Sequence, residues 1–301
     1  MSKSLRETIK EVVKCHLDDG YMAMGQCLTA VGWVGGTLPE MYEDQGMVEL
    51  PMADVAGGGI VVGAGLAGKR PMYIIRYQGF NWFNAPIVIN YAAKSKDIWK
   101  RPCPMLIRSI AMEGAIGPVA GSSHASLYYR MPGLKIASPM TPLEYVNVYK
   151  EFMNGDDVIY VSEHRGAYPN DKELKPVVWE DPDIVLIAIS ITRFSAIRAS
   201  EKLLKKGLKV AVHHLMWLKP LMLDHELINS VLHSKKGFLV LDDDYEDGMA
   251  KSIAFDISKT TSVIGQVMGL KNKTAGFARH LDNLPPNEDE IYDKVIEIIK
   301  G

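Results

Sequence analysis

Asp54 is an acidic residue with apolar neighbours, and a carboxyl group in such surroundings can act as an acid or a base. It opens a stretch, Asp54 to Gly68, whose composition predicts a helix, and methionine, alanine and valine flank it. Apolar surroundings change how tightly a carboxylate holds a proton. Alternatively, an acidic residue in a first helical turn caps free amide groups and complements the helix dipole. On the sequence alone we favour the cap.

A histidine in a glycine- and serine-rich loop is the second candidate for proton transfer. His124 lies in EGAIGPVAGSSHASLYYRMPG (113–133), just beyond a predicted strand. Loops beyond the ends of parallel strands are where ligands bind, and histidine titrates near neutral pH. An exposed loop histidine without a role fits this pattern equally well.

Four aromatic residues crowd the segment RYQGFNWFN (76–84): Tyr77, Phe80, Trp82 and Phe83. Aromatic side chains at this density usually make core or interface contacts. The alternative is that some of them stack on a flat ring of a ligand. The segment therefore predicts either a packing surface or a binding site for an aromatic ring.

The glycines Gly63, Gly65 and Gly68 match the spacing of a dinucleotide-binding fingerprint. That fingerprint must follow a strand, whereas here the predicted strand Met72–Ile75 comes after it. Each glycine inside a helix costs about 1 kcal/mol relative to alanine, and a close approach of another backbone is the usual compensation. We therefore predict a tight helix–helix or subunit contact.

Two further clusters could bind metal ions. His213 and His214 are adjacent in a predicted strand and so face opposite sides, which argues against a shared ion. Asp242, Asp243 and Asp244 end another strand and could hold a divalent cation, but solvation of polar groups at the strand end is the favoured interpretation. We expect no metal site in this chain.

Apolar runs closed by turn residues predict strands, and apolar residues at helical spacing predict helices. The first half has predicted strands at Tyr21–Met24, Met72–Ile75, Met105–Ile110, Lys135–Ala137 and Val158–Val161, and helices at Leu5–Leu17, Ala85–Lys96 and Pro142–Phe152. The second half has predicted strands at Ile184–Ile189, Leu208–Leu215 and Phe238–Leu241, and helices at Ala196–Lys206, Asp224–His233 and from Asn287 onward. This alternation predicts an α/β fold with parallel sheets covered on both faces.

The segment Arg165–Asp183 is polar, carries three prolines and shows no sustained period, which is typical of a domain boundary. We predict one domain over residues 1–170, a linker over 171–182 and a second domain over 183–301. A chain of 301 residues is long enough for two cores.

Composition excludes several classes of protein. Hydrophobic residues make up 47% and charged residues 23%, with 34 basic against 36 acidic side chains, so neither nucleic acid nor an anionic membrane is an expected partner. Cys15, Cys27 and Cys103 form neither a disulfide framework nor a zinc pattern, which favours a reducing cytoplasm. The N-terminal segment has no apolar signal core, and we expect no membrane segment.

The order of these features resembles the β subunits of 2-oxo acid dehydrogenase decarboxylating components, within the wider transketolase group. The resemblance covers nearly the whole chain. Its landmarks in the first half are VGWVGGTLPEMYEDQGMVELPMADVAGGGIVVGAGLAGKRP, YQGF, INYAAK, PMLIRS, GSSHAS, MPGLKIASP and YVSEHR. Those in the second half are DIVLIAI, GLKVAVHHLMWLKPL and GFLVLDDDYEDG.

The resemblance implies a pyrimidine-binding thiamine-diphosphate fold followed by a transketolase C-terminal-like α/β domain that mainly organises assembly. The GDG motif with its downstream asparagine, which holds Mg²⁺ and the cofactor diphosphate in this group, does not occur in the sequence. A separate α subunit is therefore expected to supply it, in an α2β2 heterotetramer. The implied substrate is a 2-oxo acid or a ketose.

Residue by residue, Asp54 matches the family glutamate that hydrogen-bonds the pyrimidine N1'. Tyr77 and Phe80 match the pair that stacks on the pyrimidine, and His124 matches the histidine that faces the substrate. Arg108 matches an arginine in the preceding strand, where a structural role is at least as plausible.

Two departures from the family pattern are visible. Asp54 is one methylene shorter than glutamate, and misplacing a catalytic group by about 1 Å can cost on the order of a hundredfold in rate. The stretch between His124 and Pro132 is a few residues shorter than is usual for the group.

Three functions remain open at this point. The first is an enzyme subunit that cleaves or transfers a carbon–carbon bond next to a carbonyl, by 2-oxo acid decarboxylation or two-carbon transfer. The second is a catalytically silent partner subunit, in which the aspartate at position 54 reflects lost activation. The third, a nicotinamide-dependent oxidoreductase built on GAGLAG, is disfavoured by the position of that motif.

Overall fold

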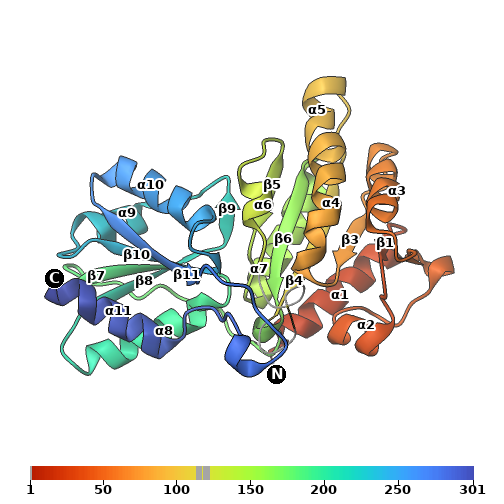
Figure 1. Cartoon of the computed structure of the whole chain (residues 1–301). Helices are drawn as coiled ribbons and strands as arrows, with labels where there is room; N and C mark the ends of the chain where they lie inside the picture. The colour runs from red at the N-terminus through yellow and green to blue at the C-terminus, as the bar shows by residue number, and fades with distance from the viewer. Residues whose placement is uncertain (1, 113–116, 118–122) are drawn as a thin grey trace. The chain divides into compact units, whose positions relative to one another are not determined.

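The structure is a computed structural model that describes residues 2–112, 117 and 123–301 (Figure 1). Contacts divide the described chain into two units. The first comprises residues 2–112 and 127–173, and the second comprises residues 117, 123–126 and 174–301. Among the described residues, no helix combines the length and the apolar character needed to cross a membrane.

The first unit is built on a parallel sheet with the strand order β2-β1-β3-β4-β6-β5. Its strands are β1 (Ala23–Gly25), β2 (Met47–Glu49), β3 (Met72–Ile75), β4 (Met105–Ala111), β5 (Leu134–Ala137) and β6 (Val158–His164). Every residue of β3, β4 and β6 is buried, as expected for central strands that helices cover on both faces. The predicted parallel α/β architecture is confirmed.

Helices and helical turns connect these strands. The helices are α1 (Leu5–Asp18), α2 (Ala30–Gly36), α3 (Asp54–Leu66), α4 (Asn81–Ile87), α5 (Ala93–Trp99), α6 (Ser126–Tyr129) and α7 (Pro142–Asn154). The short turns are η1 (Glu43–Gln45), η2 (Gln78–Phe80), η3 (Val88–Ala92) and η4 (Arg165–Ala167). Helix α3 packs against α4, and α1 packs against α7 (Figure 1).

The predicted helix Ala85–Lys96 is longer and less regular than expected. It begins at Asn81 as α4, passes through a π-helical turn at Val88–Ala92, and ends at Trp99 as α5. Pro86 lies inside this helical stretch and has no backbone N–H to donate to the helix. Separately, π-helical turns are common at functional sites. Within the aromatic segment, Tyr77 is extended, and helical structure begins with η2 at Gln78 and continues as α4 from Asn81.

Helix α2 contains a left-handed turn that the sequence did not indicate. Residues 31–35 all have positive φ, between 52° and 66°. This conformation costs about 1–2 kcal/mol for each residue that is not glycine. Such strain is typical of functional segments, and Gly32 and Gly35 adopt the conformation without that penalty.

The second unit is built on a parallel sheet with the strand order β11-β10-β7-β8. The strands in its sequence are β7 (Ile184–Ile189), β8 (Val210–Leu215), β9 (Trp217–Lys219), β10 (Phe238–Tyr245) and β11 (Gly265–Leu270). The helices are α8 (Thr192–Leu204), α9 (His225–Leu232), α10 (Met249–Thr261) and α11 (Glu288–Lys300), with a short turn η5 (Arg279–Leu281). Helix α11 packs against α8, and α10 packs against β10 and β11.

The C-terminal helix follows its predicted pattern. Asn287 caps α11 in a capping box with Glu290, and Ile291 and Val295 are fully buried in the core of the second unit. Ile298 and Ile299 are only partly buried against that core. Helix α10 and strand β11 were not predicted.

Candidate functional site

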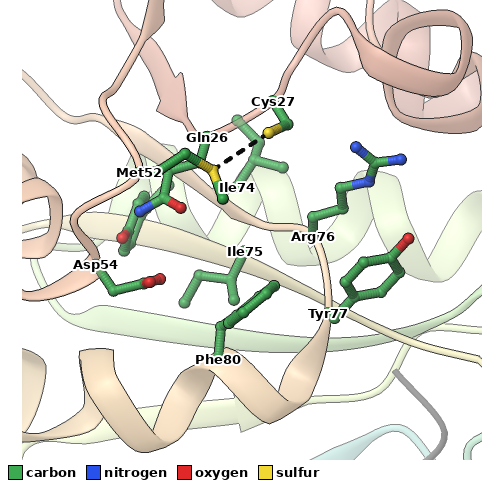
Figure 2. Close-up of a pocket in the computed structure, with 10 residues that line it drawn as sticks. Gln26, Cys27, Met52, Asp54, Ile74, Ile75, Arg76, Tyr77 and Phe80 are labelled. Carbon is green, nitrogen blue, oxygen red and sulfur yellow. Dashed lines mark hydrogen bonds between the residues drawn. The ribbon is translucent and has the colours of Figure 1, made fainter. Parts of the chain in front are cut away.

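A pocket in the first unit, with about 490 Å³ of empty space including the part open to solvent, forms at the carboxyl ends of β1 and β3 (Figure 2). Ligands of parallel α/β sheets bind at this edge. Asp54 enters from the start of α3 and Phe80 from η2 (Figure 2). The complete lining is Gln26, Cys27, Met52, Asp54, Tyr73, Ile74, Ile75, Arg76, Tyr77 and Phe80.

Asp54 does not cap helix α3. The N-cap residue is Ala53, and no side chain hydrogen-bonds there, so the favoured cap interpretation is wrong. Because Asp54 is already the first helical residue, its carboxylate is free to point into the pocket (Figure 2). Its charge still complements the dipole of the first turn.

Asn84 holds the Asp54 carboxylate. Its Nδ2 donates to Asp54 Oδ1 at 3.1 Å and to the Phe80 carbonyl at 3.0 Å, while Tyr73 donates its hydroxyl to Asn84 Oδ1 at 2.5 Å. Burial, followed by the charge of Asp54, raises the pKa of Tyr73 above its ordinary value. A Cβ on Gly58 would lie 2.9 Å from Asn84 Oδ1, so this helix position must stay small.

Tyr77 and Phe80 lie together on one side of the pocket. Their ring centroids are 6.0 Å apart and the rings are tilted by 38°. The guanidinium carbon of Arg76 is 5.5 Å from the centre of the Tyr77 ring. Trp82 and Phe83, by contrast, are 61% and 55% exposed, so the aromatic segment divides between a pocket wall and an open surface.

Buried amides fix the segment that carries Tyr77 and Phe80. Gln78 Nε2 donates to Ser162 Oγ at 2.8 Å and to the Ser109 carbonyl at 3.2 Å. Asn81 Nδ2 donates to Ser109 Oγ and to the Tyr160 hydroxyl, both at 2.9 Å. The pocket wall is therefore attached to β4 and β6 at several points.

Arg108 belongs to a closed polar cluster and does not line this pocket. Its Nε and Nη2 donate to the two carboxylate oxygens of Glu163 at 2.7 and 2.9 Å, and Nη2 also donates to Thr37 Oγ1 at 3.1 Å. Burial lowers the pKa of Arg108, but the charge and hydrogen bonds of Glu163, together with Tyr145 and Tyr168, outweigh this effect and hold the pKa above its ordinary value. This environment supports the structural role.

His124 lies in the segment that groups with the second unit, whereas Asp54, Tyr77 and Phe80 share a pocket of the first unit. Burial lowers the pKa of His124, and the charge of Asp244 acts in the opposite direction. Most of the glycine-rich sequence before it, at 113–116 and 118–122, lies outside the described residues.

The glycine-rich helix α3 has one packed face and one open face. A Cβ on Gly65 would lie 2.7 Å from Sγ of Cys103, which lies in the loop before β4, so the close contact at this glycine is with a loop rather than with another helix. A Cβ on Gly59 or on Gly63 would meet no heavy atom within 4 Å, and Ile60 beside them is 49% exposed. Because GAGLAG lies within and just after α3, it is not a strand-to-helix phosphate loop, and the nicotinamide interpretation loses its basis.

The other polar clusters do not form metal sites. His213 bonds Ser230 and His214 bonds the Lys175 carbonyl, so the two rings face apart as predicted. Within the described ranges, no group of three His, Cys, Asp or Glu side chains could hold a metal ion.

The three aspartates at 242–244 are buried rather than solvated, which corrects the favoured interpretation. They are at most 3% exposed. The physical reason is that β10 continues through them to Tyr245, across an irregularity in its pairing with β11, and that hydrogen-bond donors of Ser190 and Ser126 contact Asp243 and Asp244.

Sequence reasoning missed Asn84, Tyr73, Gln26 and Cys27. Asn84 is 30 residues from Asp54, so no local pattern connects the two residues. The Gln26 Nε2 atom is buried and has no hydrogen-bond partner among the described residues. A buried donor without a partner beside a pocket is a signal that only the structure reveals.

Two domain families match the chain. Residues 16–171 match "Transketolase, pyrimidine binding domain", and residues 175–270 match "Transketolase, C-terminal domain". Together the two matches span most of the chain in the order that the resemblance implied.

Among curated proteins, the 2-oxoisovalerate dehydrogenase subunit beta of Bacillus subtilis is 28% identical over 248 residues, covering 74% of this chain and 72% of that protein. The acetoin:2,6-dichlorophenolindophenol oxidoreductase subunit beta of Cupriavidus necator is 27% identical, with 76% and 71% covered. The pyruvate dehydrogenase E1 component subunit beta of Bacillus subtilis is 24% identical, with 84% and 83% covered.

Solved structures share the fold. One described as split gene transketolase, an inactive beta4 tetramer, aligns with a TM-score of 0.75 at 14% identity and covers 100% of this chain and 99% of that one. Transketolase from Campylobacter jejuni also aligns with a TM-score of 0.75, at 12% identity, covering 99% of this chain and 47% of that one. The solved structures show the shared fold, and the two domain matches show that the chain belongs to the transketolase family of thiamine-diphosphate-dependent enzymes, in which its curated relatives above are β subunits.

Proposed function

We propose that the pocket at Asp54 takes the aminopyrimidine ring of thiamine diphosphate, and that the chain works as the β subunit of a two-chain enzyme. That enzyme cleaves or transfers a carbon–carbon bond next to a carbonyl. The observation that carries the proposal is that Asp54, Tyr77 and Phe80, which the family pattern assigns to this ring, line one pocket.

The chemistry of the pocket fits a flat heteroaromatic ring. Ile74, Ile75 and Phe80 provide apolar walls, and the Asp54 carboxylate can accept a hydrogen bond from a protonated ring nitrogen. The unpartnered Gln26 amide can donate to a ring acceptor. When bound, the cofactor supplies the electron sink that makes cleavage next to a carbonyl possible.

The shorter side chain at position 54 is compatible with this role. Asn84 fixes Asp54 Oδ1, and Asn84 is itself held by the Tyr73 hydroxyl and the Phe80 carbonyl. A carboxylate oriented by a buried amide is positioned in advance for a directional hydrogen bond. The network therefore supports an active aspartate rather than a residue left after loss of function.

The diphosphate and Mg²⁺ are proposed to be held by an α-type partner, because the GDG motif is missing from this sequence. The open face of α3, with Gly59, Ile60 and Gly63, offers apolar surface and close backbone approach for a subunit contact. We propose an α2β2 assembly. The name of the split transketolase structure, an inactive beta4 tetramer, fits the expectation that β chains alone lack activity.

A neighbouring pocket favours an anionic substrate. It has about 300 Å³ of empty space, shares Arg76 and Tyr77 with the Asp54 pocket, and is also lined by Arg165. Among the described residues, neither arginine forms an ion pair. Guanidinium groups recognise carboxylates and phosphates, so either a 2-oxo acid or a phosphorylated ketose fits.

The test is turnover by the chain mixed with an α-type subunit of the same enzyme group, with thiamine diphosphate and Mg²⁺. Two substrate panels, 2-oxo acids with an artificial electron acceptor and ketose phosphates with an aldose acceptor, separate the two reaction types. We expect activity in one panel that Asp54→Ala reduces by a factor of about 10² to 10⁴.

The silent-subunit alternative makes the opposite prediction. It rests on the replacement of the family glutamate by Asp54. Under it, the complex forms and its turnover is the same with Asp54 and with Asp54→Ala. Equal activity of the two complexes would therefore overturn the catalytic proposal.

A further inference from the structure

The segment that carries His124 is anchored to the second unit through Ser126. The Ser126 amide donates to Asp244 Oδ2 at 3.0 Å, and the Ser126 hydroxyl accepts from the Met249 amide at 2.9 Å. The hydroxyl thus satisfies the first N–H of α10, which otherwise has no side-chain cap. Ser126 therefore attaches the segment to both β10 and α10.

The contact between Ser126 and the start of α10 is so close that position 248 has no room for a side chain. A Cβ on Gly248 would lie 2.4 Å from Ser126 Oγ and 2.9 Å from the Tyr245 carbonyl. A second close contact lies earlier in the segment, because a Cβ on Gly117 would lie 2.4 Å from the Phe277 ring. Gly117 and Ser126 therefore each lie close to a residue of the second unit, Phe277 and Gly248 respectively.

Asp244 is the charged group of this anchor. It is 3% exposed, and its two carboxylate oxygens accept from the Ser126 and Tyr245 amides. Hydrogen bonds of this kind favour the ionised form of a carboxylate. The charges of Asp244 and His124 act on one another across the same contact.

The two neighbouring aspartates differ from Asp244. Asp242 Oδ2 and Asp243 Oδ1 are buried without a hydrogen-bond partner, and Asp243 accepts from Ser190 through its other oxygen at 2.7 Å. Burial and the adjacent carboxylates raise the pKa of Asp242, and burial raises the pKa of Asp243 to about 7. Burial also raises the pKa of Asp244, while its hydrogen bonds with Ser126 and Tyr245 and the charge of His124 act in the opposite direction.

We propose that Asp244 is a positioning residue, which anchors the segment of His124 and stabilises the positive charge of its imidazolium form. Through Asp244, the second unit then influences the protonation of His124. The catalytic half of this inference rests on the proposed role of His124, whereas the link between Asp244 and His124 does not.

The direction of the effect follows from the charges. Burial lowers the pKa of His124, and Asp244 on β10 is the charged group that raises it. Neutralising Asp244 therefore leaves burial unopposed and lowers the pKa of His124 further. The charge of Asp244 raises the pKa of Asp242 and of Asp243 on the same strand, so these two residues must be left unchanged in the test.

The experiment is an NMR titration of the histidine ring protons in the full chain, with the His124 signal assigned by its loss in His124→Gln. In Asp244→Asn we expect the midpoint of the His124 titration to move to lower pH. The matched control is Asp247→Asn, an exposed residue of the next turn that pairs with Lys251, and it should leave the midpoint unchanged.

A reciprocal measurement covers the case in which Asp244→Asn does not fold, since asparagine has one acceptor oxygen for two amide donors. The carboxyl carbon of Asp244 is then titrated by NMR in the wild-type chain and in His124→Gln. Because the charge of His124 lowers the pKa of Asp244, the variant should titrate at higher pH. Linkage requires the two effects to be reciprocal.

Activity supplies the catalytic readout. In the complex, Asp244→Asn should move the limb of the pH profile that His124 controls to lower pH and reduce kcat/KM by about tenfold or more. Unchanged titration of both His124 and Asp244 would overturn the inference. Shifted titrations in a complex without thiamine-diphosphate activity would leave the linkage standing and reject the proposed function instead.

Discussion

Two hydrogen-bonded networks in the first unit use similar residue types and differ in what surrounds them. Arg108 and Glu163 are at most 1% exposed and are joined by two charged hydrogen bonds, while Nη1 of Arg108 is buried without a hydrogen-bond partner among the described residues. Asp54 is half-buried at a pocket, and a neutral amide, Asn84, holds it. The charge of a carboxylate paired with a cation is neutralised by that cation, so the group has a structural role. The charge of a carboxylate that is held by a neutral amide is not neutralised and can interact with a ligand. Burial and the choice of partner therefore separate the structural acid from the candidate catalytic one.

A substitution in the buried cluster of Arg108 and Glu163 should have the largest effect on stability. Glu163→Gln removes the charge that compensates buried Arg108, and we expect the free energy of unfolding to fall by about 3–5 kcal/mol. Urea denaturation measures this change. Asp156→Asn, which breaks only the exposed pair with Lys96, should have no measurable effect. Equal stability of Glu163→Gln and the wild-type chain would show that the cluster is not closed.

A pH dependence should follow from His164, which neighbours Glu163 in β6. Burial lowers the pKa of His164 to about 4, so the folded chain binds its proton less readily than the unfolded chain, where the value is about 6.5. The stabilising contribution is complete above pH 6.5 and is lost as pH falls toward 4. We expect a loss of about 2 kcal/mol between pH 7 and pH 5. His164→Asn should flatten this part of a urea-unfolding profile, and parallel profiles would contradict the assignment.

Substitutions in the network of Asp54 and Asn84 at the pocket should affect activity more than stability. Asn84→Ala removes the donor that orients Asp54, and we expect kcat/KM of the complex to fall by about tenfold to a hundredfold. Asn90→Ala, at an exposed position of the same helical segment, is the matched control. If the two variants retain equal activity, Asn84 does not position the carboxylate.

The glycines of α3 should give the smallest effects and separate its two faces. Gly58→Ala pushes against Asn84 and should destabilise the chain by about 1 kcal/mol or more. Gly63→Ala meets open space and should stabilise the isolated chain by about 0.5–1 kcal/mol through helix propensity. Thermal unfolding of the isolated chain compares the two. If the open face is a subunit contact, Gly63→Ala should also weaken assembly with the α-type partner.

Strong local patterns predicted much of the fold. Strands β3 and β7 have the predicted ends, because uniform apolar runs bounded by turn residues determine a buried strand. The capping boxes of α1 and α11 lie where serine or asparagine precedes glutamate by three residues. Each of these signals is contained within a few neighbouring residues.

Features that depend on distant partners were not predicted. The apolar pattern of β10 ends at Leu241 and aspartates disfavour strands, yet the strand resumes its pairing with β11 at Tyr245 after an irregularity. Strand β11 includes two glycines and is a strand through the same pairing. At the site, Asp54, Tyr77 and Phe80 were identified through the family pattern, whereas Asn84, Tyr73 and the anchor at Asp244 required the fold.

The most direct test of the central claim is calorimetric titration of thiamine diphosphate with Mg²⁺ into the chain alone, into its mixture with the α-type protein, and into the same mixture made with Asp54→Ala. The account predicts binding only in the mixture, and clearly weaker binding with Asp54→Ala. A complex that forms but binds no cofactor, or binds it equally well with Asp54→Ala, would contradict the placement of the aminopyrimidine ring at Asp54.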